Sequence, residues 1–201
     1  MPEPPAGIDE YIALLADGGP REREAAAHDL FRRGCGSAEP VLKKWFGDPD
    51  FRALAPSKSG ALLTVGIAVA PARFQAIRRN FGEPRLATPP PGENVLEFEL
   101  GFGHGVQLDI LTPREPALGG AIARFLERFG EGIQQVECAV RDVSRAAHLL
   151  QTRFGIEPLY PEPRDGADGT RVNFFLVSVA DNRKVLIELV EARSAKNPRK
   201  Q

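Results

Sequence analysis

The sequence contains few of the residues that mark a redox centre, a zinc site or a disulfide framework. It has two cysteines and three histidines among 201 residues. Cys35 and Cys138 lie far apart and form no CxxC pair, so neither a disulfide framework nor a cysteine-based metal site is indicated. His28, His104 and His148 share no metal-binding spacing with one another. We therefore expect a reduced, cytoplasmic protein without a two-histidine metal motif.

The chain also lacks an excess of charge and a long apolar run. Its 26 Lys and Arg residues nearly balance 27 Asp and Glu residues, which leaves a formal net charge of −1. Such a balance gives no electrostatic reason to bind nucleic acid or an anionic membrane. No apolar run reaches the roughly 18 residues of a membrane-spanning helix, and the first ten residues lack the pattern of a signal peptide. Neither nucleic acid nor a membrane is expected as a partner.

The first 56 residues differ in pattern from the rest and predict a helical appendage. Apolar residues recur at helical spacing over 8–15, over 20–33 and over 41–46, with Gly and Pro between these segments. The segment ADGGPREREAAAHDLFRRG resembles one unit of a HEAT-type helical repeat. One such unit cannot bury its own apolar face. Residues 7–50 should therefore pack on the rest of the chain, on a second copy in a homodimer, or on a partner protein.

Two later stretches follow the same order of predicted elements. Each begins with a strand, LLTVGIAV in one and IQQVECAV in the other, and continues with a helix that ends at Phe-Gly. A Pro-rich turn and a two-strand hairpin follow in both. An internal repeat of this length predicts two copies of one structural unit.

The segments GGAIARFLERFGEGIQQVECAVRDVSRAAHLL, PEPRDGADGTRVNFF and VLIELVEA resemble the vicinal oxygen chelate superfamily of glyoxalases, bleomycin-resistance proteins and extradiol dioxygenases. Within that superfamily they are most similar to the methylmalonyl-CoA epimerases. The resemblance implies an α+β fold in which two βαβββ modules form an open, cup-shaped mixed sheet. The implied organisation is a helical appendage (1–56), a glyoxalase-like domain (57–192) with modules at 59–113 and 132–192 around a linker helix (117–131), and a basic tail (193–201).

The resemblance also implies positions for metal ligands, which in this superfamily come from the first and last strands of each module. The family's first-strand histidines correspond to Thr64 and Gln135, and its last-strand carboxylates correspond to Asp109 and Glu188. With both histidines absent, the remaining set of Asp109, Gln135 and Glu188 offers only oxygen ligands. Oxygen ligands suit Mg²⁺, Mn²⁺ or Ca²⁺ better than zinc.

Alternation along the strands predicts which other side chains share the cup. Five carboxylates on one concave surface would repel one another unless cations or protons intervene. The loop that holds Arg164 and Arg171 could bring a guanidinium to a phosphate or a carboxylate. The expected cup for a small-molecule ligand is formed by Thr64, Glu97, Glu99, Gln107, Asp109, Gln135, Glu137, Arg171, Asn173, Phe175 and Glu188.

Three functions remain open. The resemblance implies an isomerase in which a metal holds an acyl thioester as its enolate while a carboxylate removes and returns the α-proton. Glu188 or Glu137 could be that base, since clustered acids raise one another's pKa. The second function is metal-free binding of a small molecule in the cup, and the third is a degenerate scaffold that contacts proteins through residues 7–50. The exposed face of an antiparallel sheet is normally polar, which equally explains Glu97 and Glu99.

Overall fold

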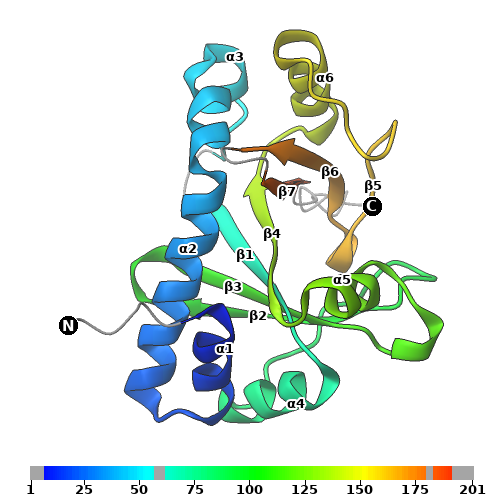
Figure 1. Ribbon diagram of the computed structural model, residues 1–201. Helices are drawn as coiled ribbons and strands as arrows, with labels where there is room; N and C mark the ends of the chain where they lie inside the picture. The colour runs from blue at the N-terminus through cyan, green and yellow to red at the C-terminus, as the bar shows by residue number, and fades with distance from the viewer. Residues whose placement is uncertain (1–6, 57–61, 180–182, 192–201) are drawn as a thin grey trace, which may run out of the picture.

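The computed structural model describes residues 7–56, 62–179 and 183–191, and it places seven strands of this part of the chain in one sheet (Figure 1). The predicted basic tail at 193–201 lies outside the described residues. The strands are β1 (Leu63–Ala68), β2 (Leu96–Phe102), β3 (Val106–Thr112), β4 (Gly132–Ala139), β5 (Arg164–Asp165), β6 (Arg171–Ser178) and β7 (Lys184–Glu191). The helices are α1 (Ile8–Asp17), α2 (Pro20–Gly47), α3 (Pro49–Arg52), α4 (Pro71–Asn80), α5 (Ala121–Phe129) and α6 (Val143–Phe154), with 3₁₀ turns at Gly103–Gly105 (η1), Pro116–Leu118 (η2) and Ala167–Gly169 (η3).

The strand order β2-β3-β1-β4-β7-β6-β5 contains the same arrangement twice. In each module the last strand runs parallel to the first, as β3 does to β1 and β7 does to β4. The two modules meet where β1 and β4 pair antiparallel, with Val65 opposite Val136. The α+β fold with a cup-shaped mixed sheet is therefore confirmed.

The modules are not identical in their strands. Module two has the short β5 before its hairpin, whereas the corresponding Pro-rich segment of module one, residues 83–95, contains no strand. Prolines at 84, 89, 90 and 91 explain the difference, because proline has no N–H to donate to a neighbouring strand.

Helix α2 corrects the prediction of two separate helices in this region. It continues without interruption through Gly34, where a break was expected. A Cβ atom at Gly34 would lie 2.5 Å from Cγ1 of Val65, so the glycine permits close contact between α2 and β1. Pro40 also lies inside the helix, and nearby the Ser37 hydroxyl donates a hydrogen bond to the Gly34 carbonyl (2.6 Å). Tertiary packing thus outweighs the weak helix propensity of this segment.

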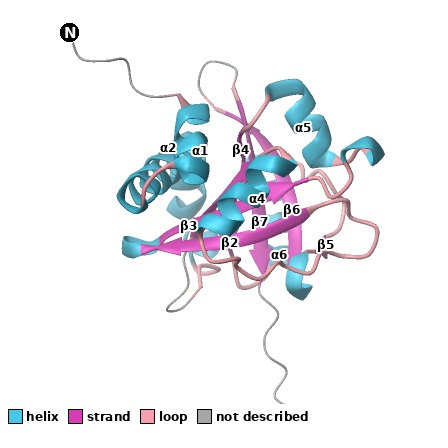
Figure 2. Cartoon of the chain, turned by 90° about the horizontal axis from the view of Figure 1, so that it is seen from below, coloured by secondary structure: helices cyan, strands magenta, loops and turns pink. Residues whose placement is uncertain are grey.

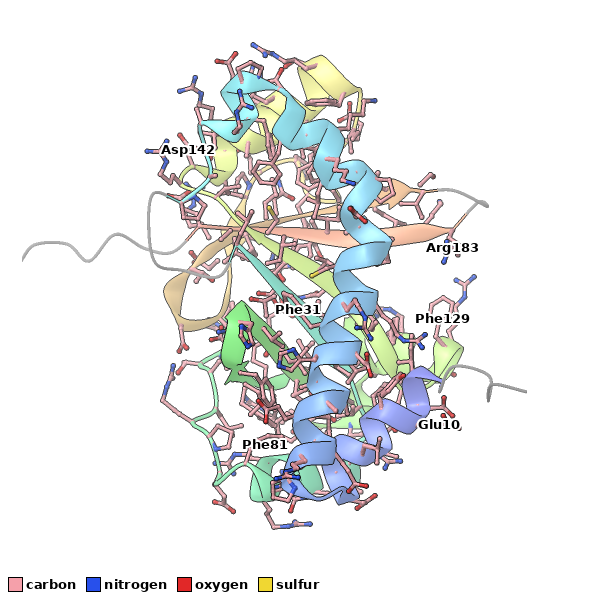
Figure 3. All side chains as sticks on the ribbon, turned by 90° about the vertical axis from the view of Figure 1, so that its left-hand side faces the viewer. Glu10, Phe31, Phe81, Phe129, Asp142 and Arg183 are labelled. Carbon is pink, nitrogen blue, oxygen red and sulfur yellow. The ribbon has the colours of Figure 1, made fainter. Side chains whose placement is uncertain are left out.

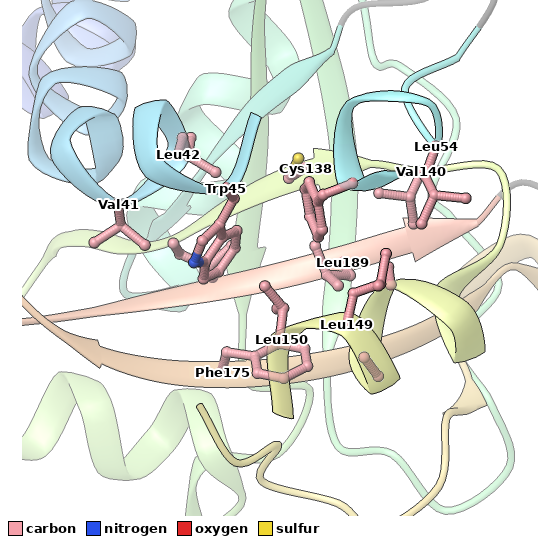
Figure 4. Packing of buried hydrophobic residues seen from close by; sticks show 14 of the residues in the cluster. Val41, Leu42, Trp45, Leu54, Cys138, Val140, Leu149, Leu150, Phe175 and Leu189 are labelled. Atoms are coloured by element: carbon pink, nitrogen blue, oxygen red, sulfur yellow. The ribbon is translucent and has the colours of Figure 1, made fainter. Parts of the chain in front are cut away.

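The apolar face of the N-terminal helices is buried against the sheet. Figure 3, which faces this side, shows α2 crossing strands of both modules. Its first half packs Leu30 with Val65 and with Phe74 of α4, in a cluster that α1 also joins. Its second half packs Trp45 with Leu150 of α6 and other residues of module two (Figure 4). Of the three expected arrangements, the structure therefore shows packing of residues 7–50 on the rest of the chain.

Figure 2 shows α1 and α2 together on one side of the strands, with α5 set apart from them. Ile122 of α5 packs with Ala68 and Leu111, in a cluster separate from those that α1 and α2 join. The concave face that α5 borders is where the predicted cup lies. Within the described residues, no helix combines the length and apolar character needed to cross a bilayer.

Candidate functional site

A cavity of about 540 Å³ occupies the concave face of the sheet, and both modules contribute to its walls. Its floor is formed by side chains of β2, β3, β4 and β7, and α5 closes one end. Two loops border its mouth, the Pro-rich segment of module one and residues 159–170 of module two.

The floor contains the five predicted carboxylates together with Gln135. They are brought together because apolar residues alternate with them along each strand: Phe98 and Val136, for example, point into the helix-covered cores. Strand pairing then sets the side chains in register, with Glu99 opposite Asp109 and Glu137 opposite Glu188. The predicted residues that line the cavity are Glu97, Glu99, Asp109, Gln135, Glu137 and Glu188.

Asn173 and Phe175 do not face the cup, contrary to the sequence-based expectation. Phe174 pairs with Glu188 across β6 and β7, so the side chains of Val172 and Phe174 line the cavity. Phe175 instead packs edge-on against Trp45 of α2, with ring centres 6.3 Å apart. Asn173 is completely buried and donates a hydrogen bond from Nδ2 to the Tyr160 carbonyl (3.1 Å). The prediction was wrong by one residue because apolar residues occupy consecutive positions in this strand.

Three further predicted residues are absent from the cavity wall. Thr64 pairs with Glu137 on the neighbouring strand but does not line the cavity. Gln107 lies beside Gly101, where a Cβ atom would be 3.2 Å from its Nε2 atom. Arg171 is exposed at the beginning of β6, and it is Arg164 of the same loop that borders the cavity.

Gln135 connects the two carboxylates of module two. Its Nε2 atom donates hydrogen bonds to Oε2 of Glu188 (2.5 Å) and to Oε1 of Glu137 (3.2 Å). The side chain reaches this position because residue 66 is glycine: a Cβ atom there would lie 2.6 Å from Cγ of Gln135. Sequence reasoning missed Gly66, although the internal repeat aligns it with Glu137 and so could have identified it.

Two acceptor atoms beside the cavity have no hydrogen-bond partner. Asp109 is only 6% exposed, and its Oδ1 atom is buried without a donor. Oε1 of Gln134, another residue that lines the cavity, is also buried without a hydrogen-bond donor. Buried acceptors without donors are costly, and such atoms at a cavity wall indicate a place for a ligand with N–H or O–H groups.

Four of the floor's carboxyl groups, those of Glu97, Asp109, Glu137 and Glu188, have raised pKa values. Burial, followed by the charges of Asp168 and Glu99, raises the pKa of Glu97 to about 7. Burial likewise raises the pKa of Glu137 to about 7, although the hydrogen bond from Gln135 opposes the shift.

Two further carboxyl groups have pKa values well above their ordinary range. For Asp109 the cause is burial, followed by the charge of Glu137 and more weakly by those of other floor carboxylates. For Glu188 the cause is burial, followed by the charges of Glu137 and Glu97. The floor thus combines two carboxyl groups that favour the protonated form with two, Glu97 and Glu137, that are partly ionised at neutral pH.

The mouth of the cavity is bordered by contacts between the two modules. Arg85 donates to the Asp168 carboxylate from Nη1 (3.1 Å) and Nη2 (2.5 Å), and the main chains of Thr88 and Asp168 are also hydrogen-bonded (2.9 Å). Arg164 forms an ion pair with Glu93 and lies 4.7 Å from the ring centre of Tyr160. These pairs join segments roughly 70 to 80 residues apart, and the sequence has no local pattern that predicts them.

The side chains at the family's metal position do not fit a metal ion as they stand. Within the described residues, no group of three His, Cys, Asp or Glu side chains is placed to hold one. Gln135 directs a donor atom, not an acceptor, towards Glu137 and Glu188, and Thr64 lies off the cavity wall. The predicted Mg²⁺, Mn²⁺ or Ca²⁺ bound by Asp109, Gln135 and Glu188 therefore stays a prediction.

Comparison with known proteins finds similarity at the level of structure. Neither a protein-family model nor a curated protein matches the sequence. Methylmalonyl-CoA epimerase from Mycobacterium tuberculosis has 28% identity and a TM-score of 0.54, over 69% of this chain and 94% of that one. A variant of the Streptomyces coelicolor enzyme, in complex with 2-nitronate-propionyl-CoA, has 26% identity and a TM-score of 0.53, over 68% of this chain and 97% of the other.

A third similar structure is a methylmalonyl-CoA epimerase in complex with methylmalonyl-CoA and NH4⁺. It has 25% identity and a TM-score of 0.52, over 68% of this chain and 97% of that chain. The glyoxalase-like fold of this protein is thus shared with solved epimerases that bind acyl-CoA compounds.

Proposed function

We propose that the protein is an isomerase that removes and returns the α-proton of an acyl thioester bound in the cup. The observation that carries this proposal is the set of carboxyl groups with raised pKa values around one cavity. A group that must both accept and donate a proton works best when its pKa lies near the working pH. The acyl-CoA ligands of similar structures support a thioester as the substrate class.

Glu137 and Glu97 are the proposed bases. Both have a pKa of about 7, so each is present in ionised and protonated forms at neutral pH. They come from different modules, Glu97 from β2 and Glu137 from β4, and therefore approach a ligand from different strands. When one group takes the proton and the other returns one to the opposite face, the configuration of the α-carbon inverts.

Glu188 is proposed to stabilise the enolate. Its pKa lies well above the ordinary range, which favours the protonated carboxyl, and the hydroxyl of that form can donate to the thioester oxygen. Gln135 donates to one oxygen of this group, which fixes the orientation of the other. As the α-C–H bond breaks, the proton passes to Glu137 and the electron pair moves onto the carbonyl oxygen, where the Glu188 hydroxyl donates its hydrogen bond. Return of a proton to the α-carbon restores the thioester.

The test is exchange of the α-proton with solvent. In D₂O, acyl thioesters incubated with the protein should gain deuterium at the α-carbon, at a rate proportional to protein concentration. Glu137→Gln should slow this exchange by about 10²- to 10⁴-fold, because an amide cannot accept the proton. Glu127→Gln is the matched control, since Glu127 lies exposed on α5 and does not line the cavity.

Two outcomes would contradict the proposal. Exchange that is unchanged in Glu137→Gln would assign the base elsewhere. No exchange with any acyl thioester, although the compounds bind, would favour the metal-free binding protein instead.

A further inference from the structure

The proposed chemistry leaves one part of the cup unused, the surface around Asp109 on β3. This side chain is almost fully buried, lines the cavity and has an Oδ1 atom without a hydrogen-bond donor. Glu99 lies opposite it across β2 and β3, and Gln134 has a second unpartnered acceptor. The side chains of this surface are therefore mainly acids and acceptors.

The cationic side chains of the cavity come from the segments at its mouth, and one of them, Arg85, also interacts with the charge of Glu99. Among the described residues that line it, the cationic side chains are Arg85 and Arg164. Both stand at the mouth, and each is already paired with an acid, Arg85 with Asp168 and Arg164 with Glu93. The floor thus has five carboxyl groups and no resident cation among these residues.

This distribution of charge conflicts with a ligand whose buried end is a carboxylate. Methylmalonyl-CoA, the compound bound in one similar structure, carries such a group. A carboxylate beside Asp109 would add a further negative charge to a cluster of acids, and the two cationic side chains that line the cavity are already paired with other acids. An ammonium group has three N–H donors and a positive charge, and it supplies the donor that Oδ1 of Asp109 lacks.

We infer that the cup binds a ligand whose buried end carries an ammonium group held by Asp109, which points to an α-amino acyl thioester as the substrate class. This inference rests on the proposed function for the thioester and on the geometry around Asp109 for the ammonium group. The ammonium also favours the chemistry, because a positive charge next to the α-carbon makes the α-proton more acidic. Phe174 and Tyr160, whose rings lie 6.0 Å apart, form an aromatic part of the cavity wall that could contact the rest of the ligand.

The test compares the affinities of three stable analogues by calorimetry. Alanyl, propionyl and methylmalonyl groups are attached as amides to one pantetheine-derived amine, so that only the acyl group differs. In EDTA-containing buffer at pH 7, the alanyl compound should bind about ten- to hundredfold more tightly than the propionyl compound. The methylmalonyl compound should bind most weakly.

The variant Asp109→Asn should reduce the alanyl-to-propionyl preference to about twofold or less, because the amide keeps the shape but cannot ionise to pair with the ammonium group. Glu127→Gln should leave that preference as in the unmodified protein. The inference is overturned if the methylmalonyl compound binds most tightly, either in EDTA or only after Mg²⁺ is added, since the acidic floor would then serve an anion or a metal ion. It is also overturned if the preference survives in Asp109→Asn.

Failure of the ammonium site can be distinguished from failure of the proposed isomerase activity. Deuterium exchange on a propionyl thioester, together with no preference for the alanyl analogue, would retain the isomerase and reject the ammonium site. Tight binding of the alanyl analogue, together with no deuterium exchange on any thioester, would retain the ammonium site and reject the isomerase.

Discussion

The internal repeat aligns Gly66 on the first strand of module one with Glu137 on the first strand of module two. Glu137 lines the cup, whereas Gly66 leaves space that Gln135 occupies. In the hairpin strands it is module one that supplies the acids and module two that supplies apolar residues. Module one places Glu97 and Glu99 on the cavity wall from β2, whereas β6 of module two places Val172 and Phe174 there. Only the last strands match, with Asp109 and Glu188 in equivalent registers.

This difference shows that the repeat forms one shared site and not two copies of a site. The glycine of module one makes room for Gln135 of module two, which then holds Glu188. The acids of β2 lie in the same cavity as the apolar wall of β6, so the cavity has a polar side and an apolar side.

The strongest test of the link between the modules is the cluster that α2 forms with module two. Trp45→Ala should lower the free energy of unfolding by about 3–5 kcal/mol, because Trp45 is completely buried. Leu30→Ala, in the half of α2 that packs on module one, should cost about 2–5 kcal/mol. Both variants should still unfold in a single transition by urea denaturation. Separate transitions for the two modules would show that α2 does not couple them.

The pH dependence of stability tests the acidic part of the cup. The folded-state pKa values of Glu97 and Glu137, about 7, lie above their ordinary value of 4.5. Between pH 4.5 and pH 7 the folded protein binds more protons than the unfolded chain. The contribution of these two groups to stability is therefore greatest below pH 4.5 and is lost as the pH rises through 7. The loss should be on the order of 3 kcal/mol for each of the two groups. Thermal unfolding at a series of pH values should show this loss of stability. The double variant Glu97→Gln/Glu137→Gln should make the melting temperature depend less on pH. An equally steep dependence in the double variant would assign the loss to other groups.

The contact between α2 and module one can be disturbed by adding a single carbon atom at Gly34. Gly34→Ala should lower stability by about 1–3 kcal/mol, because its Cβ atom would meet Val65. Gly36→Ala is a matched control two residues away, where an added Cβ atom has nothing within 4 Å. That change should stabilise the helix by up to about 1 kcal/mol. Equal effects of the two substitutions in chemical denaturation would contradict the close contact of α2 with β1.

The glycine of module one tests the position of Gln135. Gly66→Ala should displace Gln135, since the new Cβ atom would lie 2.6 Å from its Cγ atom. Loss of the hydrogen bond to Glu188 should slow α-proton exchange roughly ten- to hundredfold, and crowding against Gln135 and Leu111 should lower stability by about 1 kcal/mol. Exchange at the original rate would show that Gln135 does not position Glu188.

The sequence was sufficient to predict the two modules, because the repeat and the strand alternation appear in both stretches. Alternation also predicted that five carboxylates share one face, and all five line the cavity, since apolar residues such as Phe98 separate them. It failed in β6, where Phe174 and Phe175 are both apolar and only pairing with β7 sets the register. The continuous α2 depends on contact of Gly34 with Val65, and the pair of Arg85 and Asp168 depends on the closure of the cup. Neither of these contacts leaves a local pattern in the sequence.

The central claim is that the cup holds carboxyl groups that exchange protons near neutral pH, and a carbon-13 NMR titration of labelled glutamate carboxyls measures this directly. We expect two glutamate signals to titrate near pH 7, with one lost in Glu97→Gln and the other in Glu137→Gln. If both groups titrate near 4.5, the floor is an ordinary wet sheet surface and the account of its chemistry is wrong.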